Sequence, residues 1–313
     1  MCFVDCEVII FLSKTPMPKT KRILVLINPS SGLGVSMRML LDTFQEVWDL
    51  EDRIISYQLS KSKQDSERKV DDAIQNGIDT IIVVGGDGMI NSVGSYLLDT
   101  GVVLGVIPTG SGNGFARHFE ISLNPEKAIR SLADGKVMDI DVGTANGKPF
   151  FVTCSLAWDA AIVKSFERSP VRGILPYIFA ATYELFDYKP ERFEIKIDEQ
   201  PVEKIQHPML FTIANLTQYG GGALIAPQAR ADDGCLWLTY SLKANVAKLI
   251  PQLPKLFEGK INQVQGITST SFHNLHVTRQ SAQPIQIDGE LIPSEPEVEI
   301  GIRPKALKVL VPK

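Results

Sequence analysis

The first half of the chain alternates short apolar runs with stretches of helical periodicity. Runs rich in apolar residues predict strands at 23–27, 54–59, 81–84 and 102–107. Apolar residues recur at helical spacing over 37–48, and further helices are predicted over 66–76 and from Asn124-Pro125 to about Ala133. Repeated strand–helix–strand units of this length predict a mainly parallel, doubly wound α/β sheet with right-handed crossovers.

The pattern changes near residue 137, where turn signals begin to separate strand-like runs and helices become rare. Many of these runs alternate apolar and polar residues, as antiparallel strands with one wet face do. The predicted strands are 150–153, 193–197, 209–214, 236–242, 275–278, 285–287 and 298–302. Helices are expected at about 175–186 and, broken by prolines, near 246–257, while 307–311 could pair with either half. The pattern in this half of the chain predicts an antiparallel β-sandwich or a partly closed barrel.

These two patterns divide the 313 residues into three parts. They predict an N-terminal extension, an α/β domain that residues 303–313 could complete, and an antiparallel β domain, with bounds 1–20, 21–138 and 139–302. The apolar run 8–12 is too short to span a bilayer, and the acids Asp5 and Glu7 precede it where a signal peptide carries positive charge. We therefore expect a soluble or peripheral protein.

Composition narrows the class of protein. With 44% hydrophobic and 22% charged residues the chain resembles a globular protein with a full core. A net charge of -4 argues against a nucleic-acid-binding protein, whose binding domain is usually basic. None of the four cysteines forms a C-x-x-C pair, and the four histidines do not add the spacing of a zinc site.

Four glycine-rich segments carry the candidate chemistry, and they are 28–32, 85–88, 108–114 and 288–290. The first three each follow an apolar run and precede a helix-like stretch. At such positions a parallel sheet presents backbone N–H groups and helix N-termini to a phosphate. The fourth, Asp288-Gly289-Glu290, brings two acids to a tight turn, by default a type I′ hairpin. A nucleotide with magnesium would use both kinds of group, so phosphoryl transfer is the leading interpretation.

The individual segments leave simpler alternatives open. Asp87 would repel a phosphate unless it binds magnesium or takes a proton from an attacking hydroxyl, and it could instead cap a turn. Ser111 and Asn113 could donate to phosphate, ribose or base, although 109–114 lacks the Gly-Lys-Ser/Thr ending of a P-loop. Asn28 could contact the nucleotide through its amide, or could simply initiate a turn.

In their order along the chain, these segments resemble the lipid kinase superfamily of diacylglycerol, sphingosine and ceramide kinases and their soluble bacterial relatives. The resemblance extends from about Lys21 onward and also includes 155–160, 219–222 and 229–234. It implies an N-terminal nucleotide domain related to that of NAD kinase and a C-terminal β-sandwich domain. ATP would lie in the cleft between the domains, and the lipid would enter the second domain.

The resemblance also implies roles for particular residues. Asp87 would be the general base or a magnesium partner, and Glu290 would reach the phosphates and the metal. Nucleotide contacts would come from Asn28, Ser60 or Ser62, Gly86, Gly88, Ser111, Gly112 and Asn113. Asp233 or Asp232 matches a structural magnesium site of some bacterial members. Asp159 matches a substrate-side acid of sphingosine kinases, with an ordinary turn or helix-start aspartate as the alternative.

Two departures bear on activity and substrate. Met89 replaces the threonine or leucine that relatives commonly have, and Ser92 stands at a position where they have a glutamate that would organise the metal or the loop. The version Gly-Ser-Gly-Asn-Gly at 110–114 and the segment 155–158 lean toward sphingosine and ceramide kinases.

The predicted function is ATP- and Mg²⁺-dependent phosphorylation of a hydroxyl on a diacylglycerol- or sphingoid-type lipid by a cytoplasmic protein that associates transiently with a membrane. The apolar segment 174–179, with Lys164, Arg168 and Arg172 nearby, could meet the membrane or could be ordinary core. A homodimer is also considered, and a nucleic-acid partner is not expected. The alternatives are an NAD kinase-like enzyme for small hydroxyl compounds, and a catalytically weak nucleotide- or lipid-binding homologue, which Ser92 motivates.

Overall fold

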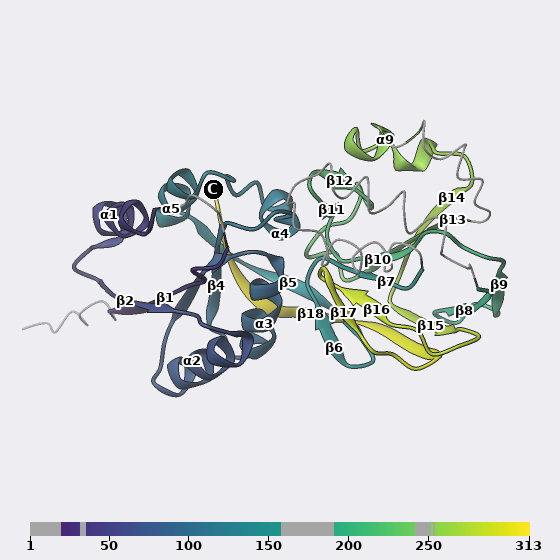
Figure 1. Ribbon diagram of the computed structural model, residues 1–313, viewed down its shortest axis with the longest axis horizontal. Helices are drawn as coiled ribbons and strands as arrows, with labels where there is room; N and C mark the ends of the chain where they lie inside the picture. The colour runs from purple at the N-terminus through teal and green to yellow at the C-terminus, as the bar shows by residue number, and fades with distance from the viewer. Residues whose placement is uncertain (1–19, 32–35, 158–190, 242–251, 253) are drawn as a thin grey trace, which may run out of the picture.

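The chain forms two domains that lie side by side, joined by strands that run through both (Figure 1). The computed structural model describes residues 20–31, 36–157, 191–241, 252 and 254–313. Among these described residues no helix has the length and apolar character needed to cross a membrane. The expected helix at 175–186, the segment 174–179 and Asp159 lie outside the described residues.

The N-terminal domain is a parallel sheet in the order β2-β1-β3-β4, covered by helices on both faces (Figure 1). Helices α1 and α5 pack together on one face, and α2 and α3 pack together on the other. The elements are β1 (Lys21–Ile27), α1 (Met37–Trp48), β2 (Arg53–Leu59), α2 (Lys63–Gln75), β3 (Thr80–Gly85), α3 (Asp87–Leu97), β4 (Val103–Pro108), α4 (Gly114–His118) and α5 (Pro125–Ala133). The predicted doubly wound α/β fold is confirmed.

Burial explains why the apolar runs become the central strands of this sheet. Val25 and Leu26 in β1, and Ile82 and Val83 in β3, are fully buried, as expected for strands covered by helices on both faces. Trp48 at the end of α1 donates its indole N–H to the carbonyl of Ile129 at 2.9 Å. The helices therefore fix the sheet from both sides and leave the carboxyl ends of its strands exposed for a ligand.

Two long strands connect the domains. β18 (Glu297–Val311) pairs with β5 (Lys136–Ala145) in antiparallel orientation, lies parallel to β4 at its C-terminal end, and pairs with β15 (Asn274–Thr278) near its start. The runs predicted separately at 298–302 and 307–311 are thus parts of one strand with an irregularity between them. At that irregularity Lys305 has a φ of 51°, and its N–H donates to Asp141 at 2.8 Å.

The C-terminal domain is an antiparallel sandwich. A six-stranded sheet in the order β14-β13-β10-β7-β16-β17 packs against the extension β18-β15-β8-β9 of the first sheet, and both contribute to one apolar core. The remaining elements are β6 (Lys148–Phe150), β7 (Thr153–Ser155), β8 (Phe193–Ile197), β9 (Glu203–Ile205), β10 (Phe211–Ala214), β11 (Gln218–Gly220), β12 (Ala223–Leu224), β13 (Leu236–Ser241), α9 (Pro254–Phe257), the 3₁₀ helix η2 (Ile261–Gln263), β14 (Ile267–Phe272), β16 (Ile285–Ile287) and β17 (Glu290–Ile292). Of the two predicted architectures, the sandwich is the correct one.

Two predicted elements differ in the structure. Residues 150–153, predicted as one strand, are the end of β6 and the start of β7 with a break between them. The strand breaks because the N–H groups of 151–153 turn toward the carboxylate of Asp288. Near 246–257 the structure describes α9 at the C-terminal end, whereas 242–251 and 253 lie outside the described residues.

Candidate active site

A cleft of about 650 Å³ lies at the carboxyl ends of β1, β2 and β3 and extends to the turn between β16 and β17. The loops of the α/β domain form most of its wall, and the second domain contributes the acidic turn 288–290. The lining residues are Asn28, Ser30, Ser31, Ser60, Lys61, Ser62, Lys63, Ser66, Gly86, Asp87, Gly88, Met89, Ser92, Gly110, Ser111, Gly112, Asp288, Gly289 and Glu290. The structure therefore brings three of the glycine-rich segments and the acidic turn to one place.

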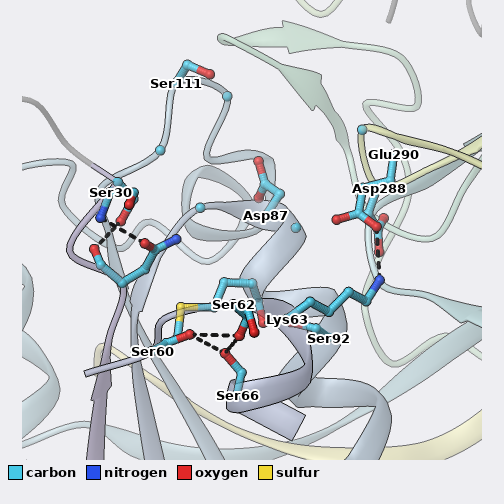
Figure 2. Close-up of a pocket in the computed structure, with 18 of the residues that line it drawn as sticks. Ser30, Ser60, Ser62, Lys63, Ser66, Asp87, Ser92, Ser111, Asp288 and Glu290 are labelled. Atoms are coloured by element: carbon cyan, nitrogen blue, oxygen red, sulfur yellow. Dashed lines mark hydrogen bonds and ion pairs between the residues drawn. The ribbon is translucent and has the colours of Figure 1, made fainter. Parts of the chain in front are cut away.

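Asp87 is the first residue of α3 and faces the cleft where two loops meet (Figure 2). Its carboxylate accepts N–H groups from Gly114 at 3.1 Å and Phe115 at 3.2 Å, which are the first residues of α4. Burial raises the pKa of Asp87 above its ordinary value, although these backbone hydrogen bonds act in the opposite direction. A carboxylate with a raised pKa is better suited to accept a proton than an exposed one.

Glycines let the loops around Asp87 pack directly on one another. A Cβ on Gly110 would lie 2.7 Å from the Cα of Gly86, and one on Gly112 would lie 3.2 Å from an oxygen of Asp87. Side chains at these positions would push the loops apart. These contacts explain the glycines at 86, 110 and 112 without any requirement for a particular ligand.

Asn113 is a predicted nucleotide contact that does not line the cleft. It has a left-handed backbone, with φ at 50°, and its side chain is buried. The amide accepts the N–H of Gly110 at 3.0 Å and donates to the carbonyl of Gly110 at 2.8 Å. Its hydrogen-bonding groups therefore hold the shape of the loop, while Ser111 and Gly112 face the cleft.

Asn28 and Ser60 both line the cleft, but their side chains also organise the loops that carry them. The amide oxygen of Asn28 accepts the N–H of Ser30 at 2.9 Å. The hydroxyl of Ser60 contacts the hydroxyl of Ser66 and donates to the carbonyl of Ser62 at 3.2 Å. A ligand would therefore meet these side chains in fixed orientations.

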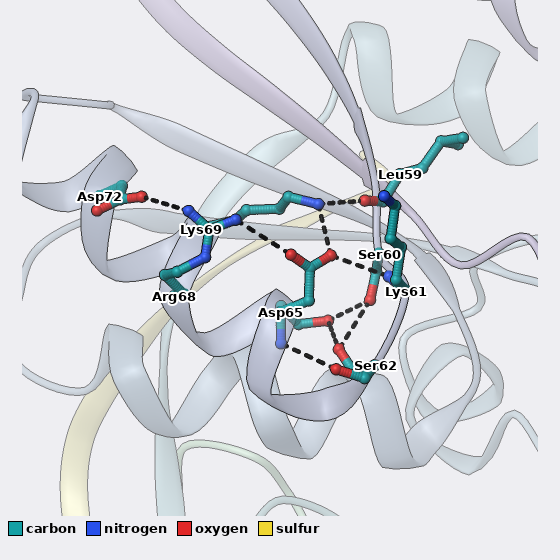
Figure 3. A network of polar contacts seen from close by, with 9 residues as sticks. Leu59, Ser60, Lys61, Ser62, Asp65, Arg68, Lys69 and Asp72 are labelled. Atoms are coloured by element: carbon teal, nitrogen blue, oxygen red, sulfur yellow. Dashed lines mark hydrogen bonds and ion pairs between the residues drawn. The ribbon is translucent and has the colours of Figure 1, made fainter.

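The loop after β2 is held by a charged network around Asp65 (Figure 3). Asp65 accepts the N–H of Lys61 at 3.0 Å and the ammonium of Lys69, which also donates to the carbonyl of Leu59. The hydrogen bond from Lys69, followed by that from Lys61, holds the pKa of Asp65 well below its usual range. Because Asp65 lies in the first turn of α2, it ties the loop carrying Ser60 to that helix.

The acidic turn forms the wall of the cleft that belongs to the second domain. Asp288 and Gly289 have φ values of 46° and 89°, which match the type I′ turn expected between β16 and β17. Glu290 follows the turn, and a Cβ on Gly88 would lie 3.0 Å from one of its oxygens. Glu290 is thus close to the residue that follows Asp87, although it is far away in the sequence.

Asp288 lies at the junction of the domains, and each oxygen of its carboxylate accepts two hydrogen bonds. It accepts the N–H groups of Phe151 and Val152 at 2.8 Å and that of Thr153 at 3.0 Å. The amide of Asn91 on α3 donates to it at 2.8 Å. Burial raises its pKa to about 6 despite these hydrogen bonds. Asp288 therefore links the helix that begins at Asp87 to the turn that carries Glu290.

The predicted metal residue lies elsewhere. Asp233 is absent from the lining of the cleft, and its carboxylate accepts the N–H of Cys235 at 3.2 Å. Asp232 pairs with Arg230 at 3.4 Å. In the part of the chain that the structure describes, no group of three or more His, Cys, Asp and Glu side chains is arranged to hold a metal ion.

Ser92 occupies the cleft where the resemblance implies a glutamate. It is buried, and its hydroxyl donates to the carbonyl of Met89 one turn earlier at 3.1 Å. The wall of the cleft therefore carries a hydroxyl bonded to Met89 where the resemblance implies a carboxylate.

Three residues of this region were not singled out by the sequence, namely Lys61, Lys63 and Asn91, while Asp288 was predicted only as one of the two acids of the tight turn. Asn91 and Asp288 lie inside motifs that the sequence did identify, so hydrogen-bonding side chains within those motifs were the available signal for their contact. The two lysines had a weaker signal, because they follow a predicted strand in the same loop as Ser60.

His118 connects the cleft loops to the second domain and gives a testable pH dependence. Its Nδ1 accepts the N–H of Thr217 at 3.2 Å, and burial lowers its pKa to about 4 from 6.5. As the pH falls, the imidazole of His118 gains a proton in the unfolded chain before it does so in the folded protein. The contribution of neutral His118 to stability is therefore fully present above pH 6.5 and is lost as the pH drops toward 4. The full loss is about 3 kcal/mol.

Urea unfolding at a series of pH values tests this expectation. The His118→Gln variant keeps an acceptor for Thr217 but cannot gain a proton, so its stability should change less than that of the wild type between pH 6.5 and 4. Identical slopes for the two proteins would show that His118 is not the titrating group.

Comparison with known proteins identifies the family. A model of the diacylglycerol kinase catalytic domain matches residues 22–145, and a model of the YegS C-terminal NAD kinase beta sandwich-like domain matches residues 153–311. The chain belongs to this lipid kinase family. The predicted resemblance is therefore confirmed, and the two matched regions cover the two domains described above.

Similar proteins agree with this assignment. Diacylglycerol kinases of Mycobacterium tuberculosis and Bacillus subtilis are each 28% identical to the chain, covering 93% and 88% of it and 96% and 92% of their own lengths. A crystal structure of a diacylglycerol kinase from Bacillus anthracis matches with a TM-score of 0.71 at 19% identity, covering 93% of this chain and 97% of that one. This last similarity supports the fold alone.

Proposed function

We propose that the protein transfers the terminal phosphoryl group of ATP to a hydroxyl of a diacylglycerol- or sphingoid-type lipid. The observation that carries this proposal is the meeting of Asp87 and Glu290, from different domains, in one cleft lined by glycines, serines and lysines. Lipid kinase family membership supports the reaction class. The lining of the cleft supports a nucleotide as the phosphoryl donor, because its hydrogen-bonding groups are backbone N–H groups, hydroxyls and ammonium groups, which bind phosphate oxygens.

In this proposal the protein mainly positions the reactants and balances their charge. The N-terminus of α3 and the loop containing Ser111 and Gly112 bind phosphate oxygens. Asp87 accepts the proton of the lipid hydroxyl, and its raised pKa improves the match between base and acceptor. Asp288 fixes the turn so that Glu290 faces the same space.

The residues fit a magnesium ion that arrives with the nucleotide. Mg²⁺ usually takes one or two carboxylates and completes its shell with phosphates and water, and Glu290 offers such a carboxylate, while a contact from Asp87 would be the alternative to its role as the base. When bound, the ion would neutralise charge on the phosphates. A separate structural magnesium at Asp233 stays a prediction, since that carboxylate lies outside the cleft.

The proposal that a lipid accepts the phosphoryl group is supported by the family and by the sequence. Lipid access from a membrane surface, a substrate contact by Asp159 and a cytoplasmic location remain proposals, as does a homodimer. The sequence lean toward sphingoid-type lipids makes these acceptors the first to compare with diacylglycerol.

A phosphoryl-transfer assay with labelled ATP tests the function. The purified protein is incubated with Mg²⁺ and, separately, diacylglycerol, sphingosine, ceramide, mixed extracted lipids or NAD. A labelled lipid product supports the proposal, and product from NAD alone supports an NAD kinase-like enzyme instead. Nucleotide binding without product in any mixture supports the catalytically weak homologue that buried Ser92 suggests. The variant Asp87→Asn serves as the inactive reference.

A further inference from the structure

An ion pair between the domains crosses the cleft. Lys63 is the first residue of α2 in the α/β domain, and Glu290 begins β17 in the second domain. The ammonium of Lys63 lies 3.0 Å from a carboxylate oxygen of Glu290, although the residues are 227 positions apart. Figure 2 shows the lysine extended across the cleft toward the acidic turn. Both side chains line the space assigned to the nucleotide.

The ion pair is weak enough for Lys63 to leave Glu290 and bind another partner. The side chains of Lys63 and Glu290 are 49% and 45% exposed. Ion pairs of this kind are screened by water and contribute little to stability. The loop that carries Lys63 is held separately by Asp65, so the end of the lysine can move while its backbone stays in place.

The charge of the cleft also favours such an exchange. Among the described lining residues the cations are Lys61 and Lys63, and the acids are Asp87, Asp288 and Glu290. A triphosphate adds several negative charges to this space. Phosphate oxygens are strong acceptors for an ammonium group, so a bound nucleotide competes with Glu290 for Lys63.

The position of the pair indicates which phosphate is contacted. One oxygen of Glu290 lies 3.0 Å from the place of a Cβ on Gly88, which directly follows Asp87. Because the transferred phosphoryl group must lie beside the base that receives the acceptor proton, the Lys63 ammonium is at the reacting end of the cleft.

We propose that Lys63 leaves Glu290 when the nucleotide binds and takes the terminal phosphate as its new partner. The carboxylate of Glu290 would then be free to bind the Mg²⁺ ion that arrives with the nucleotide. This inference rests on the proposed function, since it requires a nucleoside triphosphate in the cleft. It adds a specificity-determining residue, because a lysine on the terminal phosphate distinguishes ATP from ADP.

Titration calorimetry with ATP and with ADP in the presence of EDTA tests the exchange. We expect Lys63→Gln to weaken ATP binding about tenfold or more while changing ADP binding less than about twofold. Lys63→Arg keeps the positive charge and should retain most of the preference for ATP. Glu290→Gln should strengthen ATP binding without metal, because Lys63 is then free and a negative charge is gone. Lys127→Gln, a change of the same type in the first turn of α5, is the control and should have no effect.

The outcomes separate this inference from the function beneath it. Wild-type protein that binds neither nucleotide would overturn the kinase proposal and this inference together. If the wild type prefers ATP and Lys63→Gln keeps that preference, the lysine role is wrong while the kinase proposal stands. Two further results would overturn the exchange. One is that Lys63→Gln weakens the binding of ATP and of ADP equally, and the other is that Glu290→Gln weakens the binding of ATP in EDTA.

Discussion

Asp87→Asn is expected to lower the rate of phosphoryl transfer about a thousandfold while leaving nucleotide affinity within about threefold. The amide has nearly the same shape as the carboxylate, but it cannot take a proton from the acceptor hydroxyl. Turnover with labelled ATP and nucleotide affinity by calorimetry, measured on the same preparation, check both halves of this expectation.

The variant also affects folding, so its stability must be measured. Each carboxylate oxygen of Asp87 accepts a backbone N–H, one from Gly114 and one from Phe115, and an amide can accept only one of them. A loss of about 1 kcal/mol in unfolding free energy is therefore expected. Asp42→Asn on the exposed face of α1 is the matched control and should change neither rate nor stability.

Two results would change the role assigned to Asp87. Equal losses of nucleotide affinity and turnover would mean that the carboxylate binds the donor rather than activating the acceptor. Recovery of the rate at high Mg²⁺ concentration would mean that it acts through the metal, the alternative role that the sequence left open.

The sequence predicted that the loops of the N-terminal domain converge, for a simple physical reason. Strands such as 81–84 are continuous apolar runs, and the carboxyl ends of parallel strands meet at one edge of a sheet. The loops after β1 and β3, containing Asn28 and Asp87, were therefore expected to converge, and both line the cleft. Their convergence follows from local patterns alone.

Contacts between distant segments were not predictable in this way. The pairing of β5 with β18 joins residues about 160 positions apart, and no local pattern reports the register of such a pair. The same limit applies to Lys63 and Glu290, whose contact depends on how the two domains are placed. The sequence placed Glu290 at the site by family resemblance and missed its lysine partner.

Asn113 illustrates a different limit. Its residue type suits a nucleotide contact, but the left-handed backbone directs its amide into hydrogen bonds with Gly110. Asparagine often adopts this conformation and bonds its own loop, so the residue type supports both roles equally. Only the backbone geometry distinguishes a residue that shapes a loop from one that touches a ligand.

Asp288→Asn is expected to destabilise the protein by about 3 kcal/mol and to reduce phosphoryl transfer in the fraction that stays folded. The carboxylate of Asp288 receives three backbone N–H groups at 151–153 and the amide of Asn91. An asparagine offers one accepting oxygen, so at least one buried donor loses its partner. The turn then no longer holds Glu290 against the helix that begins with Asp87.

Asp198→Asn is a closely matched control for this change. Asp198 has the same φ of 46° and accepts the N–H groups of His273 and Asn274, at 3.0 and 2.8 Å, but it lies far from the cleft and is partly exposed. Urea unfolding and transfer rates of both variants measure the difference. Asn91→Ala removes the amide that donates to Asp288 and to the carbonyl of Pro149, and it leaves the carboxylate in place, so it should fold and show a smaller loss of stability together with a loss of rate. If Asn91→Ala keeps the full rate, the link between α3 and the acidic turn does not position Glu290, and Asp288 matters only for folding.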